Sequence, residues 1–435
     1  MARTEPRTAQ NTMKCPARPE EVDLFSPGAQ EHWYEAYPIL HAQSPVHRIP
    51  GEGSIPGTDG FILTKYEDIV RVVLDPDRFP PGLTTPPKLN PDGSMPQLNA
   101  MMVSILSLRP NEELWRAHKS ELTDPWVGAG ASRHHDMIEA AANALIDTWI
   151  DDASVDFVGR FARLLPQIVM ANVLGFPHED IPRMEKWGEA QVLAFVHGHG
   201  HRNMLTPEQA EDQMRTLAGF AEYVAGWVVE KRKRPKNDMI SWLTQVTYSP
   251  LDRKLTDVEI NGIVYAMMIG GLETTQYAIA EQAQLFCEDS DLYRTVRNDR
   301  SKLRGFIEES LRLRSPTQGL STRTTKQDEE FQGVKAPAGS ILHMRWAAAN
   351  RDPGEWECPH ELQLDRKAVT RHVTFSRGSR SCPGSGISRQ EQLIAWTCLM
   401  DRIEALEYGT GNTFEHQPGI MLGLYELKLN FIKAA

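Results

Sequence analysis

The longest apolar pattern in the chain follows Thr256. Thr256 and Glu259 form a capping-box pair at the start of a predicted helix, and an apolar-rich segment continues from there to about Phe286. At the usual rise per residue such a helix is roughly 45 Å long, enough to cross a whole domain. Near its middle the adjacent residues Gly270 and Gly271 weaken the helix, and we expect a local kink there.

Shorter patterns predict further helices and a few strands. The predicted segments are strands at 60–64 and 341–346, helices at 65–74 and 390–405, and irregular chain over 350–380. Residues 1–20 are polar and lack an apolar stretch, so we expect a disordered N-terminal segment. Together the patterns predict a mainly α-helical protein with minor β structure.

The strongest candidate for chemistry is the loop from Phe375 to Gly384, which contains Cys382. A thiolate ligand must stay deprotonated, and the N-terminus of a helix favours negative charge. Pro383 suits the first position of a following helix, and Gly378 and Gly384 would let backbone N–H groups approach the sulfur. We interpret Cys382 as a thiolate ligand of a haem iron; the alternative is a buried structural cysteine in an ordinary turn.

The spacing Phe-x-x-Gly-x-Arg-x-Cys-x-Gly resembles the signature of the cytochrome P-450 superfamily of haem-thiolate monooxygenases. The resemblance runs from about Asp23 to the C-terminus and implies one catalytic domain over residues 21–435. It also implies that haem b lies between a long distal helix and the helix that follows the cysteine loop. Because the N-terminal residues offer no signal or anchor segment, the chain is similar to the soluble bacterial type, and we expect a cytoplasmic protein.

The segment from Gly270 to Thr275 resembles the distal-helix motif of this family. The resemblance assigns Glu273 and Thr274 to the acid and the alcohol that organise proton delivery. The alternative is a pair of glycines required for packing, with a surface glutamate beside them.

Further roles follow from the same resemblance. The expected haem contacts are Trp115, Lys119, Gly271, Arg323, Phe375, Arg380 and Gly384. Lys119 stands where arginine is usual, and a lysine cannot bind a carboxylate through two donors. Glu309, Arg312 and Arg366 match the structural triad of the family and are expected to hold the fold without acting in catalysis.

The segments that form the substrate pocket in this family correspond to 84–106, 191–204, 267–275, 317–320 and 421–424. The candidate pocket residues are Met101, Met102, Phe195, Met267, Gln318, Leu320, Met421 and Leu422. They suggest an adaptable apolar cavity in which a polar group could orient the substrate. The histidines in 197–201 fall at the roof of this pocket, where they either contact substrate or form exposed surface; a metal site is the less favoured interpretation.

The net charge of −11 argues against nucleic acid as a partner. The chain holds no flavin or ferredoxin module, so electrons must come from a separate ferredoxin or flavodoxin-type donor with its reductase. Basic residues near the cysteine could steer such an acidic donor, unless they bind haem or complete the triad. They are Arg366, Lys367, Arg371, Arg377, Arg380 and Arg389.

The sequence therefore predicts a monomeric monooxygenase that inserts one atom of O2 into a small or medium-sized organic substrate. Hydroxylation and oxidative O- or N-dealkylation both remain open. Two other functions are possible from the residues. A peroxide-driven haem-thiolate peroxygenase would not need the Glu273 and Thr274 relay, and a non-enzymatic haem sensor could use the cysteine loop alone.

Overall fold

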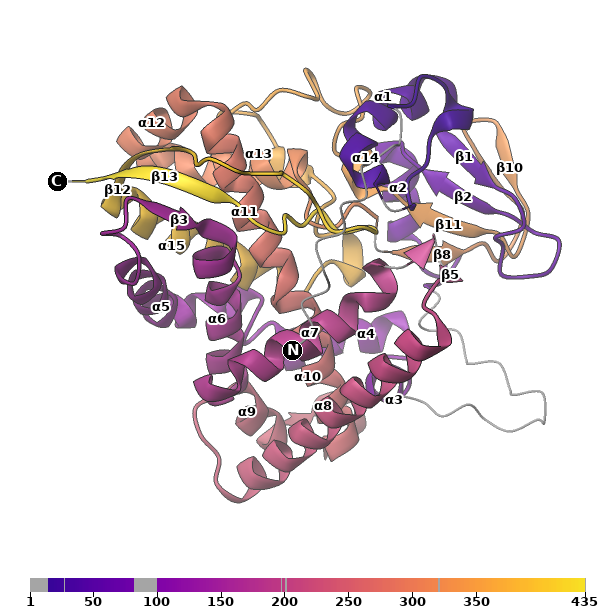
Figure 1. Cartoon of the computed structure of the whole chain (residues 1–435). Coiled ribbons are helices and arrows are strands. Elements are labelled where there is room, and N and C mark those ends of the chain that lie inside the picture. The colour runs from indigo at the N-terminus through magenta and orange to yellow at the C-terminus, as the bar shows by residue number, and fades with distance from the viewer. Residues whose placement is uncertain are drawn as a thin grey trace.

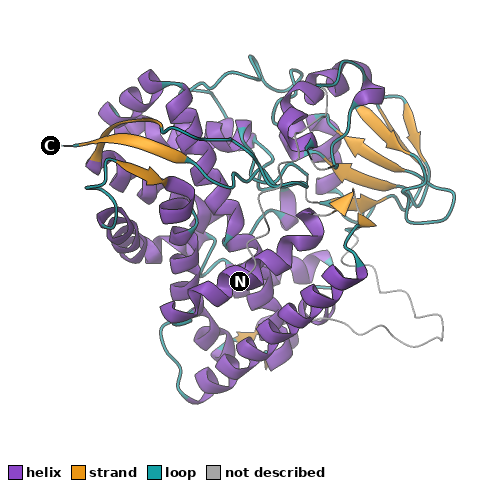
Figure 2. Cartoon of the chain, in the orientation of Figure 1, coloured by secondary structure: helices purple, strands orange, loops and turns teal. Residues whose placement is uncertain are grey.

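The structure is a computed structural model that describes residues 15–26, 28–81, 100–196, 198–199, 202–319 and 321–434. Helices make up most of it, and a larger group of strands lies at one side (Figure 2). The predicted fold class, mainly α with minor β, is confirmed. No helix in the described ranges is both long enough and apolar enough to cross a membrane.

The helices and strands are distributed along the whole described chain (Figure 1). The helices are α1 Trp33–Gln43, α2 Tyr66–Leu74, α3 Ala100–Leu108, α4 Glu112–His118, α5 His135–Asp147, α6 Leu164–Leu174, α7 Ile181–Val196, α8 Pro207–Lys233, α9 Met239–Gln245, α10 Asp257–Gly271, α11 Glu273–Glu288, α12 Ser290–Asn298, α13 Leu303–Leu313, α14 Trp346–Ala349 and α15 Ser385–Arg402. The strands are β1 Val46–Ile49, β2 Gly60–Leu63, β3 Ser154–Asp156, β4 Gly198–His199, β5 Arg202–Asn203, β6 Thr247–Tyr248, β7 Arg253–Lys254, β8 Thr322–Thr324, β9 Glu329–Phe331, β10 Val334–Ala336, β11 Ile341–Met344, β12 Ile403–Tyr408 and β13 Lys428–Lys433.

Two sheets lie on opposite sides of the helical body (Figure 1). One has four strands in the order β1-β2-β11-β8, with β2 and β11 parallel and in register at Gly60 and Ile341. The other has three antiparallel strands in the order β12-β13-β3. The strands predicted at 60–64 and 341–346 are therefore present but shorter, since they end at Leu63 and Met344 and α14 begins at Trp346, and they are neighbours in the first sheet.

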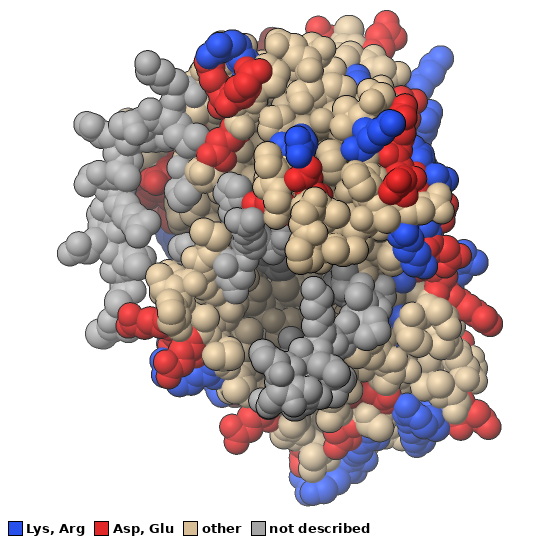
Figure 3. Space-filling model, turned by 90° about the vertical axis from the view of Figure 1, so that its right-hand side faces the viewer, with Lys and Arg blue, Asp and Glu red and all other residues tan. Residues whose placement is uncertain are grey.

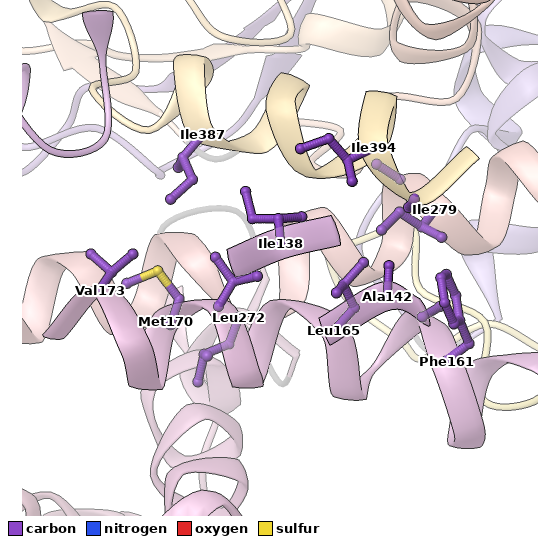
Figure 4. Close-up of a cluster of buried hydrophobic side chains, with 14 of the residues drawn as sticks. Ile138, Ala142, Phe161, Leu165, Met170, Val173, Leu272, Ile279, Ile387 and Ile394 are labelled. Atoms are coloured by element: carbon purple, nitrogen blue, oxygen red, sulfur yellow. The ribbon is translucent and has the colours of Figure 1, made fainter. Parts of the chain in front are cut away.

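The long predicted helix is present and is interrupted at Leu272, between α10 and α11. Thr256 and Glu259 form the predicted capping box. The Thr274 hydroxyl donates to the carbonyl of Gly270 at 2.6 Å, which competes with helical hydrogen bonding at the break. The predicted kink is confirmed, and Figure 4 shows the Leu272 side chain within the core formed by α5, α6, α11 and α15.

Some predicted boundaries are wrong. Helix α15 begins at Ser385, so Pro383 precedes the first turn, and it ends at Arg402 instead of continuing to 405. Residues from Ile403 onward form β12, because they pair with β13 at the far end of the chain, and local periodicity cannot reveal such pairing. The segment 350–380 is irregular apart from short 3-10 turns, as predicted.

The predicted disordered segment 1–20 falls partly outside the described residues, which begin at Cys15. The described end of this segment enters a 3-10 turn, Pro19–Glu21. Glu21 holds the turn by accepting hydrogen bonds from the Ala17 backbone N–H at 2.9 Å and from the Arg18 guanidinium at 2.6 Å. The described residues 15–20 therefore include part of a hydrogen-bonded turn.

Candidate functional site

Cys382 lies on the loop immediately before α15. Its backbone N–H donates to the carbonyl of Phe375 at 2.8 Å, which closes the loop. Gly378 has a φ of 73°, in the left-handed region that favours glycine, and Ser376 has a φ of 57°. These turns bring the cysteine back over the start of the helix.

The surroundings of the sulfur combine burial with hydrogen-bond donors and positive charge. Burial raises the pKa of the Cys382 thiol, while backbone N–H groups of Gly384 and Ser385 and the charges of Lys119 and Arg389 act in the opposite direction. These groups would stabilise the thiolate that a metal requires. The arrangement fits the thiolate ligand predicted from the sequence.

Guanidinium groups gather on one side of this loop, around Trp115 on α4. The Arg380 guanidinium lies 4.0 Å and that of Arg109 4.4 Å from the centre of the Trp115 ring. Arg323 on β8 adds a third charge near Arg380. Glu112 accepts a hydrogen bond from Arg380 at 2.5 Å and is the acid that contacts this cluster.

Some hydrogen-bonding groups of this cluster have no partner among the described residues. Arg109 Nε, Arg323 Nε and His118 Nε2 are buried without a hydrogen-bond partner among the described residues. Burial, and then the charge of Arg380, lower the pKa values of Arg109 and Arg323 to about 10. Buried cations left unpaired are costly, so the cluster fits a ligand that brings carboxylates, as the two propionates of haem would.

Sequence reasoning missed Arg109 and His118. Arg109 follows α3. Arg380, the other arginine that contacts the Trp115 ring, lies far along the chain. No local spacing indicates such a contact, and only the folded arrangement of α3, α4 and the cysteine loop brings these residues together.

Trp115 on α4 and Lys119, the residue after α4, have protein partners that sequence reasoning did not anticipate. The Trp115 ring contacts the guanidinium groups of Arg109 and Arg380. Lys119 Nζ donates to the Ser381 hydroxyl at 2.6 Å and to the Ser381 carbonyl at 3.3 Å. Lys119 is thus fastened to the residue that precedes Cys382, and its charge acts on the sulfur.

On the distal side, the two glycines of the kink have different surroundings. A side chain at Gly271 would begin 2.7 Å from the sulfur of Met170 on α6, whereas one at Gly270 would meet no described atom within 4 Å. Gly271 therefore allows α6 to pack closely, and Gly270 is the glycine that faces open space. The haem contact predicted for Gly271 stays a prediction.

Glu273 is the titratable group of the kink. Burial raises its pKa to about 7, although a hydrogen bond from Tyr277 lowers it; the charge of Glu189 raises the pKa further and that of Arg163 lowers it. A carboxyl group with a pKa near neutral can both donate and accept a proton. Thr274 follows directly, and its hydroxyl already donates to Gly270.

The structure brings Glu309, Arg312 and Arg366 together in the interior. Arg312 donates to both carboxylate oxygens of Glu309, at 2.6 and 3.0 Å, and Arg366 Nε donates to Glu309 at 2.9 Å. Arg312 also donates to three backbone carbonyls of the irregular segment that precedes the cysteine loop. Such fully paired charges brace this segment.

The candidate pocket residues converge only in part. Met101 and Met102 are half-buried on α3, which packs against α10 where Met267 is buried. Met421 and Leu422 are buried on the C-terminal loop, which comprises residues 409–427 between β12 and β13. Seen from the side that carries the four-stranded sheet, the surface is hollowed at its centre, and the described residues visible there are neither acidic nor basic (Figure 3).

The other pocket candidates are bound within the fold or lie outside the described residues. Gln318 is fully buried; its amide oxygen accepts from the Tyr37 hydroxyl at 2.5 Å, and its amide N–H donates to the Ser315 carbonyl at 2.8 Å. A contact of Gln318 with substrate stays a prediction. Leu320, the side chain of Phe195, most of 84–106 and the side chains of the histidines in 197–201 lie outside the described residues.

Comparisons with known proteins agree with this site. The family model for cytochrome P450 matches residues 280–431. Cytochrome P450(MEG) of Priestia megaterium is 28% identical over 359 residues, covering 81% of this chain and 83% of its own length. The polyketide biosynthesis cytochrome P450 PksS of Bacillus subtilis is 27% identical over 399 residues, covering 88% and 92%.

A solved structure extends the comparison to the fold. P450BioI, crystallised with hexadec-9Z-enoic acid ligated acyl carrier protein, superposes with a TM-score of 0.78 at 22% identity, covering 93% of this chain and 99% of its own. The matched family model includes the cysteine loop, the triad and most of α11. These matches and the thiolate site make the chain similar to members of the cytochrome P450 superfamily, which bind haem.

Proposed function

We propose that this protein is a haem-thiolate monooxygenase that inserts one atom of O2 into a small or medium-sized organic substrate. The observation that carries the proposal is the combination of two sites: Cys382 at the start of α15, and the adjacent acid and alcohol, Glu273 and Thr274, at the kink of the distal helix. The similarity to cytochrome P450 proteins supports the reaction class.

Each residue has a distinct task in this proposal. Haem b bound here would supply the activation of dioxygen. Cys382 would be its axial ligand. Arg109 and Arg323 would hold its propionates, because each has a buried Nε without a partner among the described residues, and Arg380, which is paired with Glu112, lies beside them. Thiolate ligation favours cleavage of the O–O bond.

Proton delivery would depend on the kink. The Thr274 hydroxyl is held by Gly270, beside the open space that the missing side chain of Gly270 leaves. Glu273 would release a proton toward this hydroxyl and regain one from the solvent side, as its pKa of about 7 allows. The presence of this acid and alcohol favours the monooxygenase over a peroxygenase or a sensor.

The electron donor would dock near Cys382, although fewer basic residues are available than the sequence suggested. Arg366 is bound to Glu309, Arg380 to Glu112, and Arg389 to Glu308. Lys367 remains exposed, and no ion pair of Lys367 is present among the described residues. A separate ferredoxin with its reductase is the donor we propose, attracted by a smaller positive surface than expected.

Turnover with labelled oxygen tests this function. With a ferredoxin, its reductase and 18O2, the product should contain one labelled oxygen atom, and peroxide alone should support much slower turnover. Equal or faster turnover with peroxide would identify a peroxygenase. Haem binding without any product from a broad panel of substrates that shift the haem spectrum would favour the sensor.

A further inference from the structure

A cavity of about 110 Å³ with a mixed polar and apolar lining lies beside the kink of the distal helix. A water molecule needs about 10–15 Å³ of such space, so the cavity has room for several. Polar residues of its lining come from the start of α6, from α7, from α11 and from the C-terminal loop. They include Arg163, Glu185, Glu189, Glu273, Tyr277 and Gln417.

The cavity connects Glu273 with the protein surface. Two residues that line the cavity reach the surface: Glu189 on α7 is exposed, and Tyr425 is 50% exposed. Tyr277, which also lines the cavity, is only 3% exposed. A side chain at Gly188 on α7 would begin 3.1 Å from Leu272 and 3.9 Å from the Glu273 carboxylate. The missing side chain at position 188 therefore keeps the cavity open to Glu273.

Two residues fix the Glu273 carboxyl at this cavity. The Tyr277 hydroxyl donates to Glu273 Oε2 at 2.5 Å, one turn along α11. Gln417, on the C-terminal loop, in turn donates from its side-chain amide to the Tyr277 hydroxyl. Neither residue belongs to a local motif, and Gln417 lies 140 positions from Tyr277.

The C-terminal loop that carries Gln417 also carries pocket residues. The Tyr277 ring is buried in one apolar cluster with Met421 and Leu422. A side chain at Gly423 would begin 2.5 Å from the Tyr277 ring and 2.6 Å from the Gln417 amide, so only glycine lets the loop close on both. The loop thus contacts the acid-holding tyrosine from two sides.

We propose that Tyr277 and Gln417 are positioning residues that hold the Glu273 carboxyl toward the cavity, and that the C-terminal loop, through Gln417 and Gly423, thereby supports proton uptake. The inference deepens the proposed function and rests on it. In each cycle Glu273 releases one proton toward Thr274 and regains one from cavity water, so its carboxyl returns to its starting state.

The charges around Glu273 support this role. Glu189 and Glu185 on α7, Arg163 at the start of α6, and Tyr277 on α11 are the ionisable groups that line the cavity with it, together with Tyr425. Arg163 is paired with Glu185 at 3.1 Å. Removing the Tyr277 hydroxyl should raise the pKa of Glu273, since its hydrogen bond stabilises the carboxylate.

Infrared difference spectroscopy of the resting holoenzyme tests the positioning directly, without turnover. The carboxylic C=O band of Glu273, identified by its loss in Glu273→Gln, should titrate near pH 7 in the wild type. In Tyr277→Phe the midpoint should rise by about one unit, a tenfold change in the dissociation constant. Gln417→Leu should raise it by less. Tyr293→Phe, which removes a buried hydroxyl that donates to the Ile403 carbonyl at 2.9 Å, is the matched control and should leave it unchanged.

Turnover tests the link to the loop. The fraction of reducing equivalents that appears in product should fall several-fold in Tyr277→Phe and in Gly423→Ala, and the pH at which this fraction is half-maximal should move upward with the infrared midpoint. An unchanged infrared midpoint in Tyr277→Phe would overturn the positioning role. A shifted midpoint with unchanged coupling and pH profile would overturn the link to proton uptake. Failure of the proposed function is distinct, because the wild-type enzyme would then yield no labelled product.

Discussion

The two sides of the candidate haem site use charge in opposite ways. On the cysteine side, Glu309, Arg312 and Arg366 form a closed set in which every charge has a partner in the interior. On the distal side, Glu273 faces a cavity, and burial raises its pKa to about 7. The first arrangement fixes a backbone segment, and the second holds a proton that can move.

This contrast separates buried charges that stabilise the fold from buried groups that can take part in chemistry. A fully paired set resists change, and removing one member leaves another buried without a partner. A titratable group with few partners and access to water is suited to chemistry. The following predictions separate the two kinds of charge.

The largest effect is expected from the closed set. Arg312→Met should leave the Glu309 carboxylate buried with only part of its hydrogen bonds, and we expect the free energy of unfolding to fall by about 3–5 kcal/mol. Urea denaturation checks this value. Arg215→Met is the control, because the Arg215 and Asp212 side chains are 71% and 65% exposed, and its cost should stay below about 1 kcal/mol. If Arg312→Met and Arg215→Met lowered the free energy of unfolding equally, the proposed difference between buried and exposed ion pairs would be contradicted.

A titratable group on the C-terminal loop gives the next effect. Burial lowers the pKa of His416, but hydrogen bonds and charges of Glu281 and Glu31 outweigh burial and raise this pKa from 6.5 to about 9. A raised pKa contributes stability that is fully present below about pH 6.5 and is lost as the pH rises through 9. The expected loss reaches about 3 kcal/mol. Denaturation at a series of pH values should show it in the wild type, and the slope should flatten in His416→Gln.

At the kink, the expected effect is on chemistry and not on stability. Thr274→Ala should keep haem and substrate binding, while product formed per reducing equivalent falls on the order of tenfold and peroxide or water increases. Thr275→Ala is the neighbouring control; its hydroxyl bonds Ser388 at 3.0 Å instead of the kink. Product that stays tightly coupled in Thr274→Ala would show that the hydroxyl takes no part in proton delivery.

The smallest effect concerns the electron donor. Lys367→Glu should slow reduction of the haem by the cognate ferredoxin several-fold at low salt, because exposed charges act over about 8 Å at physiological ionic strength. Stopped-flow absorbance measures the rate. Lys233→Glu, at the end of α8, makes the same charge change away from the cysteine loop and should leave the rate unchanged. Rates insensitive to both Lys367→Glu and salt would place docking elsewhere.

Short-range patterns predicted the parts of the site that are local in sequence. The cysteine loop and the kink each occupy a few consecutive residues, and their backbone requirements are visible as glycine, threonine and cysteine at fixed spacing. The positions of Arg109 near Arg380 and of Gln417 near Tyr277 could not be predicted, because the two residues of each pair are distant in sequence. The prediction that the last helix reaches 405 was wrong for the same reason, because the residues after Arg402 pair with the distant strand β13.

Ligation by Cys382 is the central claim, and the spectrum of the reduced protein with carbon monoxide tests it most directly. We expect the red-shifted absorption band of thiolate-ligated haem in the wild type and its loss in Cys382→His. Variants of the other cysteines, Cys15, Cys287, Cys358 and Cys398, should keep the band. An unaltered band in Cys382→His would contradict the assignment of the ligand and the proposed function built on it.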